Sequence, residues 1–116
     1  MRTEILFNSI DASVSQASTP YYIDCGQDMR WMLTVKSTGL DGVPSLFVEE
    51  TPNGSDWIPL NNNDEQGILD YFPLDDDLIS IRDSYFMGKG FRVRIETNGN
   101  TTGTIDATLI IKTKSN

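Results

Sequence analysis

Apolar and polar residues alternate along much of this chain, and this period constrains the fold more than any other feature of the sequence. Successive side chains of a β-strand point to opposite faces, so alternation gives a strand one apolar and one polar face. The clearest apolar row is Met29, Trp31, Leu33 and Val35. No long segment carries the apolar i, i+3, i+4 stripe of a helix. The sequence therefore predicts an all-β protein with few helical residues.

Residues Ser45–Leu60 predict a β-hairpin. The first part alternates as a half-buried strand does, and Pro52, Asn53 and Gly54 follow it. Proline presets φ, while asparagine and glycine tolerate positive φ, so these residues favour a chain reversal. Trp57 opens the returning strand, and we expect its ring to pack into the core.

Turn signals recur along the rest of the chain, as is typical of a sandwich or barrel. We expect one domain of about seven to nine antiparallel strands, most simply a β-sandwich of the immunoglobulin-like or jelly-roll type. Phe91–Glu96 and Ile105–Ile111 alternate best, so we expect them to pair as a long hairpin, with Lys112 and Lys114 at its edge. The predicted core comprises Trp31, Leu33, Val35, Leu46, Val48, Trp57, Val93, Ile95, Ala107 and Leu109.

Length and charge limit the classes of protein. The chain has 116 residues and a net charge of −8, from 17 acidic and 9 basic residues. This length fits one domain with its own core. Nucleic acid and anionic membranes are disfavoured as partners, because their phosphates need Lys or Arg for neutralisation. Cys25 is the only cysteine, which excludes a disulfide within the chain and predicts a small buried apolar side chain.

The ends and the hydropathy of the chain bear on its location. The opening MRTEILFNSID lacks the basic, apolar and small-residue order of a signal peptide. No segment approaches the roughly 20 apolar residues of a membrane-spanning helix. We expect a soluble protein made in a cytoplasm.

Catalytic residues are scarce. The chain has no histidine, so a serine or cysteine nucleophile would lack an imidazole base. Aspartates are numerous, but none pairs with another in a predicted apolar pocket that would raise one pKa. We expect a protein that is not an enzyme and needs no cofactor.

The acidic run Asp75–Asp77 is the candidate metal site, with calcium as the candidate ion. Its spacing differs from the DxDxDG calcium loop, and consecutive side chains point in different directions. A solvated acidic edge is therefore favoured. Asn53–Ser55 and Asn100–Thr102 fit the glycosylation sequon, but we interpret both as turn chemistry.

Aromatic residues in or beside loops are the candidate contact residues. Their rings could close the ends of the core, contact another subunit or stack on sugar rings, and the first two uses are favoured. Arg82, Arg92 and Arg94 are available for ion pairing. The candidate contact residues are Tyr21, Tyr22, Tyr71, Phe72, Tyr85, Phe86 and Met87, together with Arg82.

The hairpin VEETPNGSDWIPL resembles the S/T-x-(N/D)-G-x-x-W-x-x-L signature of small β-sandwich virion proteins of tailed bacteriophages. The layout of the chain is similar as well, over most of residues 10–113. A Ser/Thr/Ala-rich opening over Ile10–Pro20 precedes a strand that ends in Ser37-Thr38-Gly39. After the Trp57 hairpin come Phe91-Arg92-Val93-Arg94-Ile95 and the closing Gly103-Thr104-Ile105-Asp106-Ala107-Thr108-Leu109.

This resemblance implies a non-enzymatic structural protein of the virion, most simply an accessory or decoration protein of the capsid. It implies other virion proteins as partners and many copies, for which a closed homo-oligomer such as a trimer is expected. The hairpin is also similar to the S-x-D-G-x-x-W piece of discoidin-like jelly rolls, although Pro52-Asn53 replaces the usual Ser-x-Asp order. That similarity implies the alternative, a carbohydrate-binding module or a receptor-binding domain at a fibre tip.

The segment Met1–Phe7 has two interpretations. Ile5, Leu6 and Phe7 are consecutive apolar residues near a chain end, where a strand is otherwise expected to fray. They could complete the protein's own sheet, or they could form an arm that adds to the open sheet edge of a neighbour.

Overall fold

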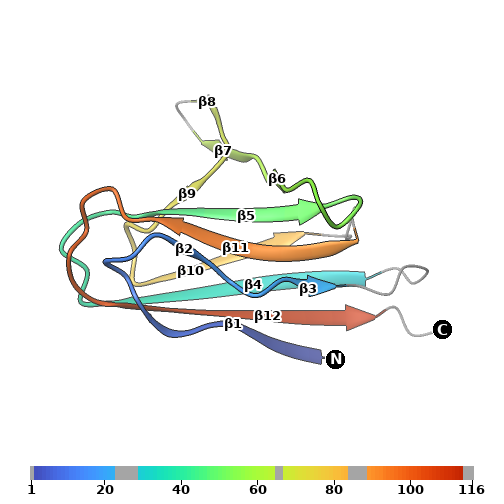
Figure 1. The fold of residues 1–116 in the computed structure, drawn as a ribbon, viewed down its shortest axis with the longest axis horizontal. Coiled ribbons are helices and arrows are strands. Elements are labelled where there is room, and N and C mark those ends of the chain that lie inside the picture. The colour runs from blue at the N-terminus through green and yellow to red at the C-terminus, as the bar shows by residue number, and fades with distance from the viewer. Residues whose placement is uncertain (1, 23–28, 65–66, 84–88, 114–116) are drawn as a thin grey trace.

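The protein is a β-sandwich, as the sequence predicts, in which two antiparallel sheets pack face to face (Figure 1). The computed structural model describes residues 2–22, 29–64, 67–83 and 89–113. Within these ranges there is no helix. The same ranges contain twelve strands rather than the seven to nine expected, because six of them are only two or three residues long.

The first sheet has four strands in the order β1-β12-β4-β10. Its edges are β1 and β10, and β4 and β12 pair along their whole length in its centre. The bounds of these strands are β1 Arg2–Asp11, β4 Met29–Thr38, β10 Leu78–Asp83 and β12 Thr104–Thr113.

The second sheet has six strands, with β11 and β5 paired in its centre. Short strands flank this pair: β2 and β3 lie beside β11, and β6 and β9 lie beside β5. The bounds are β2 Gln16–Ala17, β3 Tyr21–Tyr22, β5 Ser45–Thr51, β6 Ile58–Pro59, β9 Phe72–Pro73 and β11 Gly90–Glu96. A separate hairpin of β7 Asn62–Asp64 and β8 Gly67–Leu69 extends from this side of the molecule (Figure 1).

Alternate residues of the long strands form the core between the sheets. Nine of the ten predicted core residues are buried there, from Trp31 to Leu109. Trp31 packs edge-on against Phe91 with ring centroids 4.9 Å apart. The prediction for Trp57 is wrong, because its ring is only half buried and lies outside the core cluster.

The predicted hairpin of the last two long strands is also wrong. β11 belongs to the six-stranded sheet and pairs with β5, whereas β12 belongs to the other sheet and lies between β1 and β4. The connection must therefore cross from one sheet to the other. Gly103 lies at its end with φ +94°, and a Cβ there would stand 2.4 Å from the carbonyl oxygen of Thr38. Only glycine fits this approach.

Asn100 fixes that crossing. Its side chain is buried, and its Oδ1 accepts hydrogen bonds from the backbone N–H groups of Asp41 and Gly42. Its Nδ2 donates to the carbonyl oxygens of Ala12 and Thr102. This role agrees with the interpretation of Asn100–Thr102 as turn chemistry.

Residues 2–7 lie in β1 and pair with β12 of the same chain. Phe7 is buried in the core, while Ile5 is exposed. The pairing is irregular, with register shifts on both sides of Phe7 and positive φ at Ser9. In the single chain this segment therefore completes its own sheet, and an arm that docks on a neighbour stays a prediction for an assembly.

Candidate functional site

The candidate site lies on the outer face of the six-stranded sheet, along β5 and β11 (Figure 1). Residues that face each other across an antiparallel pair project to the same side of the sheet. Val93 faces Val48 on the core side, so the neighbouring pairs, Arg92 with Glu49 and Arg94 with Phe47, project outward. Two long cationic side chains thus lie beside a carboxylate and an aromatic ring.

Glu49 joins the two arginines. Its Oε1 accepts a hydrogen bond from Arg92 Nε at 2.8 Å and lies 3.5 Å from Arg94 Nε. Arg94 Nη1 also donates to Glu96 Oε1 at 2.5 Å. Although Glu49 points away from the core, it is only 5% exposed. The arginines therefore cover this carboxylate, and the two positive charges meet two negative ones.

Each of the two guanidinium groups lies against an aromatic ring. Arg92 Cζ lies 4.4 Å from the ring centroid of Trp57, and Arg94 Cζ lies 4.1 Å from that of Phe47. Both distances are within the range of cation–π attraction. The ring of Tyr71 lies 6.0 Å from that of Phe47. We name these residues the ladder: Trp57, Arg92, Glu49, Arg94, Glu96, Phe47 and Tyr71.

The turn after β5 places Trp57 in the ladder. Thr51 Oγ1 accepts a hydrogen bond from Gly54 N, and Asn53 Oδ1 accepts from the N–H groups of Ser55 and Asp56. Gly54 has φ +87°. These contacts reverse the chain within a few residues, so β6 pairs with β5 and Trp57 lies over the outer face.

Tyr22 extends the same face beyond the ladder. Gly90 pairs with Thr51 at the next outward position of β11. A Cβ on Gly90 would lie 3.0 Å from the Tyr22 ring and 3.1 Å from Thr51 Cγ2. The Tyr22 ring therefore rests on the bare backbone of Gly90, and it is 55% exposed.

The structure separates the contact residues predicted from the sequence. Tyr22 and Tyr71 lie on the outer face, whereas Tyr21 and Phe72 pack against the core. Arg82 is exposed on β10, in the other sheet. Tyr85, Phe86, Met87 and also Cys25 lie outside the described residues.

The sequence identifies Arg92 and Arg94 as available for ion pairing but does not identify their partners. Alternation in β11 already places Arg92 and Arg94 opposite the core residues, and alternation in β5 does so for Phe47 and Glu49. The missing information was the pairing of β5 with β11, which brings the two outward rows together. The size of Trp57 predicts a core position, but the ring lies outside the core cluster.

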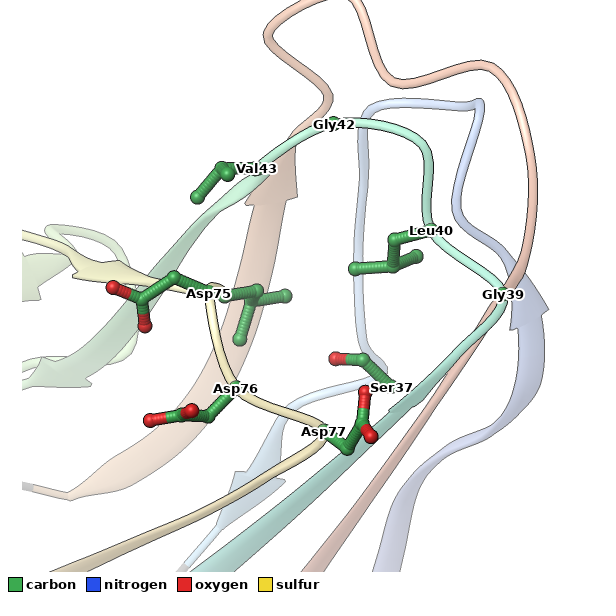
Figure 2. A pocket seen from close by; sticks show the side chains of 9 residues that line it. Ser37, Gly39, Leu40, Gly42, Val43, Asp75, Asp76 and Asp77 are labelled. Carbon is green, nitrogen blue, oxygen red and sulfur yellow. The ribbon is translucent and has the colours of Figure 1, made fainter.

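The candidate calcium site is not assembled in this structure. Across the described ranges, no three Asp, Glu, Cys or His side chains are grouped closely enough to hold a metal ion. Asp75–Asp77 are exposed, and the carboxylates of Asp75 and Asp76 point away from that of Asp77 (Figure 2).

The ladder provides a fixed surface for contact. Its rings and guanidinium groups are half buried and hold one another in place, and its charges pair internally. Tyr, Trp and Arg are also the residue types that dominate the binding energy of protein interfaces.

Comparison with family models, with curated proteins and with solved structures found no match to this chain. The described part of the structure also contains no helix long and apolar enough to cross a membrane.

Proposed function

We propose that this protein is a non-enzymatic structural protein whose copies assemble through the ladder. The observation that carries the proposal is the internally paired set of arginines and aromatic rings on one face of the sandwich. Aromatic residues and arginine are enriched at the centres of interfaces, and this face combines both in a fixed arrangement.

Charge favours a second copy of the chain as the occupant. The protein has a net charge of −8, so most of its surface opposes self-association. At the ladder, two arginines face two glutamates, and the local charges cancel. Two copies can therefore meet at this face without the repulsion expected elsewhere.

The hairpin and the strand layout resemble those of small virion proteins of tailed bacteriophages, and this resemblance suggests the particle in which the protein acts. We propose a tailed-phage particle, with the protein as an accessory or decoration protein of the capsid. Genes beside this one should then encode portal, protease and capsid proteins, and neighbours of carbohydrate metabolism would contradict the setting.

Immunogold electron microscopy tests the position in the particle. An antibody raised against the purified chain should label the capsid of purified particles at regular positions. Particles without label would contradict the proposal, and label confined to fibre tips would support the alternative role.

The alternative is a carbohydrate-binding module, and the exposed Tyr22 ring favours it. The other outer rings fit it less well, because Arg92 and Arg94 already occupy a face of Trp57 and of Phe47. A glycan array without signal, both with calcium and after chelation, would remove this alternative.

A further inference from the structure

A pocket of about 340 Å³ lies at the end of the sandwich where the chain crosses between the sheets (Figure 2). One wall is the loop from β4 to β5, and the other is the segment from Leu74 to Asp77 that leads from β9 to β10. Leu74 N donates to Pro44 O at 2.9 Å, and Ser37 N donates to Asp77 O at 2.8 Å. Both walls are therefore fixed by backbone hydrogen bonds.

The lining combines apolar walls with an acidic side. Leu40, Val43 and Leu74 supply the apolar surface, and Asp75–Asp77 supply the carboxylates. Such a lining suits a ligand that has a hydrocarbon part and a positive charge.

Ser37 provides an independent indication of a ligand. It continues the inward row of β4 and is only 4% exposed. Its Oγ has no hydrogen-bond partner among the described residues. Figure 2 shows this hydroxyl directed into the pocket, on the side of Asp77. Buried polar groups are nearly always hydrogen-bonded, so a hydroxyl placed this way indicates a bound group.

We propose that this pocket binds an alkylammonium group. Asp77 carboxylate and Ser37 Oγ accept hydrogen bonds from the ammonium, which has only donors to offer. Leu40, Val43 and Leu74 contact the methylene groups next to it. The same chemistry is present in a free alkylamine and in the lysine side chain of another protein.

A calcium ion fits the pocket less well than an ammonium group. Calcium needs six to eight converging oxygen ligands. Here Asp75 and Asp76 point away from Ser37 (Figure 2), and the described residues contain no metal-binding group of acids. The pocket is also separate from the ladder, so this proposal and the proposed function can fail independently.

The test is an NMR titration of the full chain, following the backbone amide signals of Ser37, Leu40, Val43 and Asp77. The probes are n-pentylammonium and Nα-acetyl-lysine methylamide, with 1-pentanol as the uncharged match and calcium chloride as the metal. We expect saturable shifts with an ammonium probe and none with pentanol. Binding of the lysine derivative would identify a protein side chain as a possible source, and binding of pentylammonium alone would identify a free amine.

Variants assign the binding to the named groups. Asp77→Asn should weaken pentylammonium binding about tenfold or more, since a charge-assisted hydrogen bond is lost. Ser37→Ala should weaken it several-fold without lowering thermal stability, because the hydroxyl has no partner among the described residues of the free protein. Asp70→Asn changes the net charge equally but does not line the pocket, so it should bind as the wild type does.

Three results would overturn the proposal. These are an absence of shifts with both ammonium probes, equal shifts with pentanol, and shifts with calcium alone. Unchanged affinity in Ser37→Ala together with Asp77→Asn would overturn it as well.

Discussion

The two sheets carry outer faces of different character, although the same alternation along the strands builds both. On the six-stranded sheet, the ladder joins rings and guanidinium groups of β5 and β11 with the ring of Trp57, which precedes β6. On the four-stranded sheet, the outward pairs across β4 and β12 include Thr34 with Thr108, Lys36 with Asp106 and Met32 with Ile110. No ion pair between described residues links β4 to β12 or to β10.

This difference affects the entropy that each face would lose on contact with a partner. Side chains that are already held in one conformation lose little entropy when a partner arrives, whereas free side chains must be ordered first. The ladder is therefore suited to assembly, and the face of the four-stranded sheet is suited to solvent.

The largest difference in unfolding free energy should be found between variants of the two tryptophans. Trp31→Ala empties a core site and should cost about 3–5 kcal/mol of unfolding free energy. Trp57→Ala removes a half-buried ring and one cation–π contact, so about 1–2 kcal/mol is expected. Urea denaturation of both variants measures the difference. Equal losses would show that Trp57 belongs to the core after all.

Removing the carboxylate at the centre of the ladder should cause the second-largest loss of stability. Glu49→Ala leaves Arg92 and Arg94 without their shared acceptor, which should cost about 2–3 kcal/mol; the arginines are partly exposed, so the full cost of a buried pair is not reached. The match on the other sheet is Asp106→Ala, which loses a carboxylate bonded to Ser9 and should cost about 0.5–1 kcal/mol. Similar losses at both sites would contradict the distinction between the faces.

Replacing an arginine of the ladder by lysine should have a smaller effect on stability. Arg94→Lys keeps the charge but loses the planar group that contacts Phe47, and about 0.5–1 kcal/mol is expected. Arg82→Lys, on the exposed surface of β10, should change stability by less than about 0.5 kcal/mol. Thermal melts of both variants provide the comparison, and an equal response would indicate that the stacking contributes nothing.

Low pH should have the smallest effect on stability. It acts through two aspartates in the loops that join the two sheets. Hydrogen bonds from the Thr101 hydroxyl and backbone lower the pKa of Asp41 below its ordinary value of 3.8. Bonds from the Ser13 hydroxyl and backbone lower the pKa of Asp11 in the same way.

A carboxylate with a lowered pKa in the folded state stabilises the protein above its unfolded pKa, and this contribution is lost as the pH falls through the folded value. Stability should therefore decline below about pH 4. Thr101→Val should reduce the dependence on pH in this range, and an unchanged profile would remove Asp41 as a cause.

Alternation was sufficient to predict the sandwich and nine of the sixteen buried apolar residues in the described core, because the strands that carry residues such as Leu33, Val48 and Ile95 each have only one apolar face. It could not predict which strands pair. β11 and β12 are consecutive and equally regular, yet Gly103 and Asn100 direct the chain from one sheet to the other.

The ladder depends on the pairing of β5 with β11. The sequence therefore indicates which ladder residues point outward but not which of them are in contact. The core position predicted for Trp57 is wrong for a related reason. β6 has only two residues, too few for alternation to define a face, and the turn before it determines where the ring lies.

Sedimentation velocity of matched double variants tests the central claim, that the ladder is the assembly surface. Trp57→Ser with Tyr71→Ser removes two half-buried apolar side chains from the ladder, and Met32→Ser with Ile110→Ser removes two from the outer face of the four-stranded sheet. Circular dichroism should first establish that both variants are folded. We predict that the wild type and the Met32/Ile110 variant form the same closed oligomer, whereas the Trp57/Tyr71 variant is a monomer. An oligomer that survives in the Trp57/Tyr71 variant, or a wild type that is monomeric at every concentration, would contradict the account.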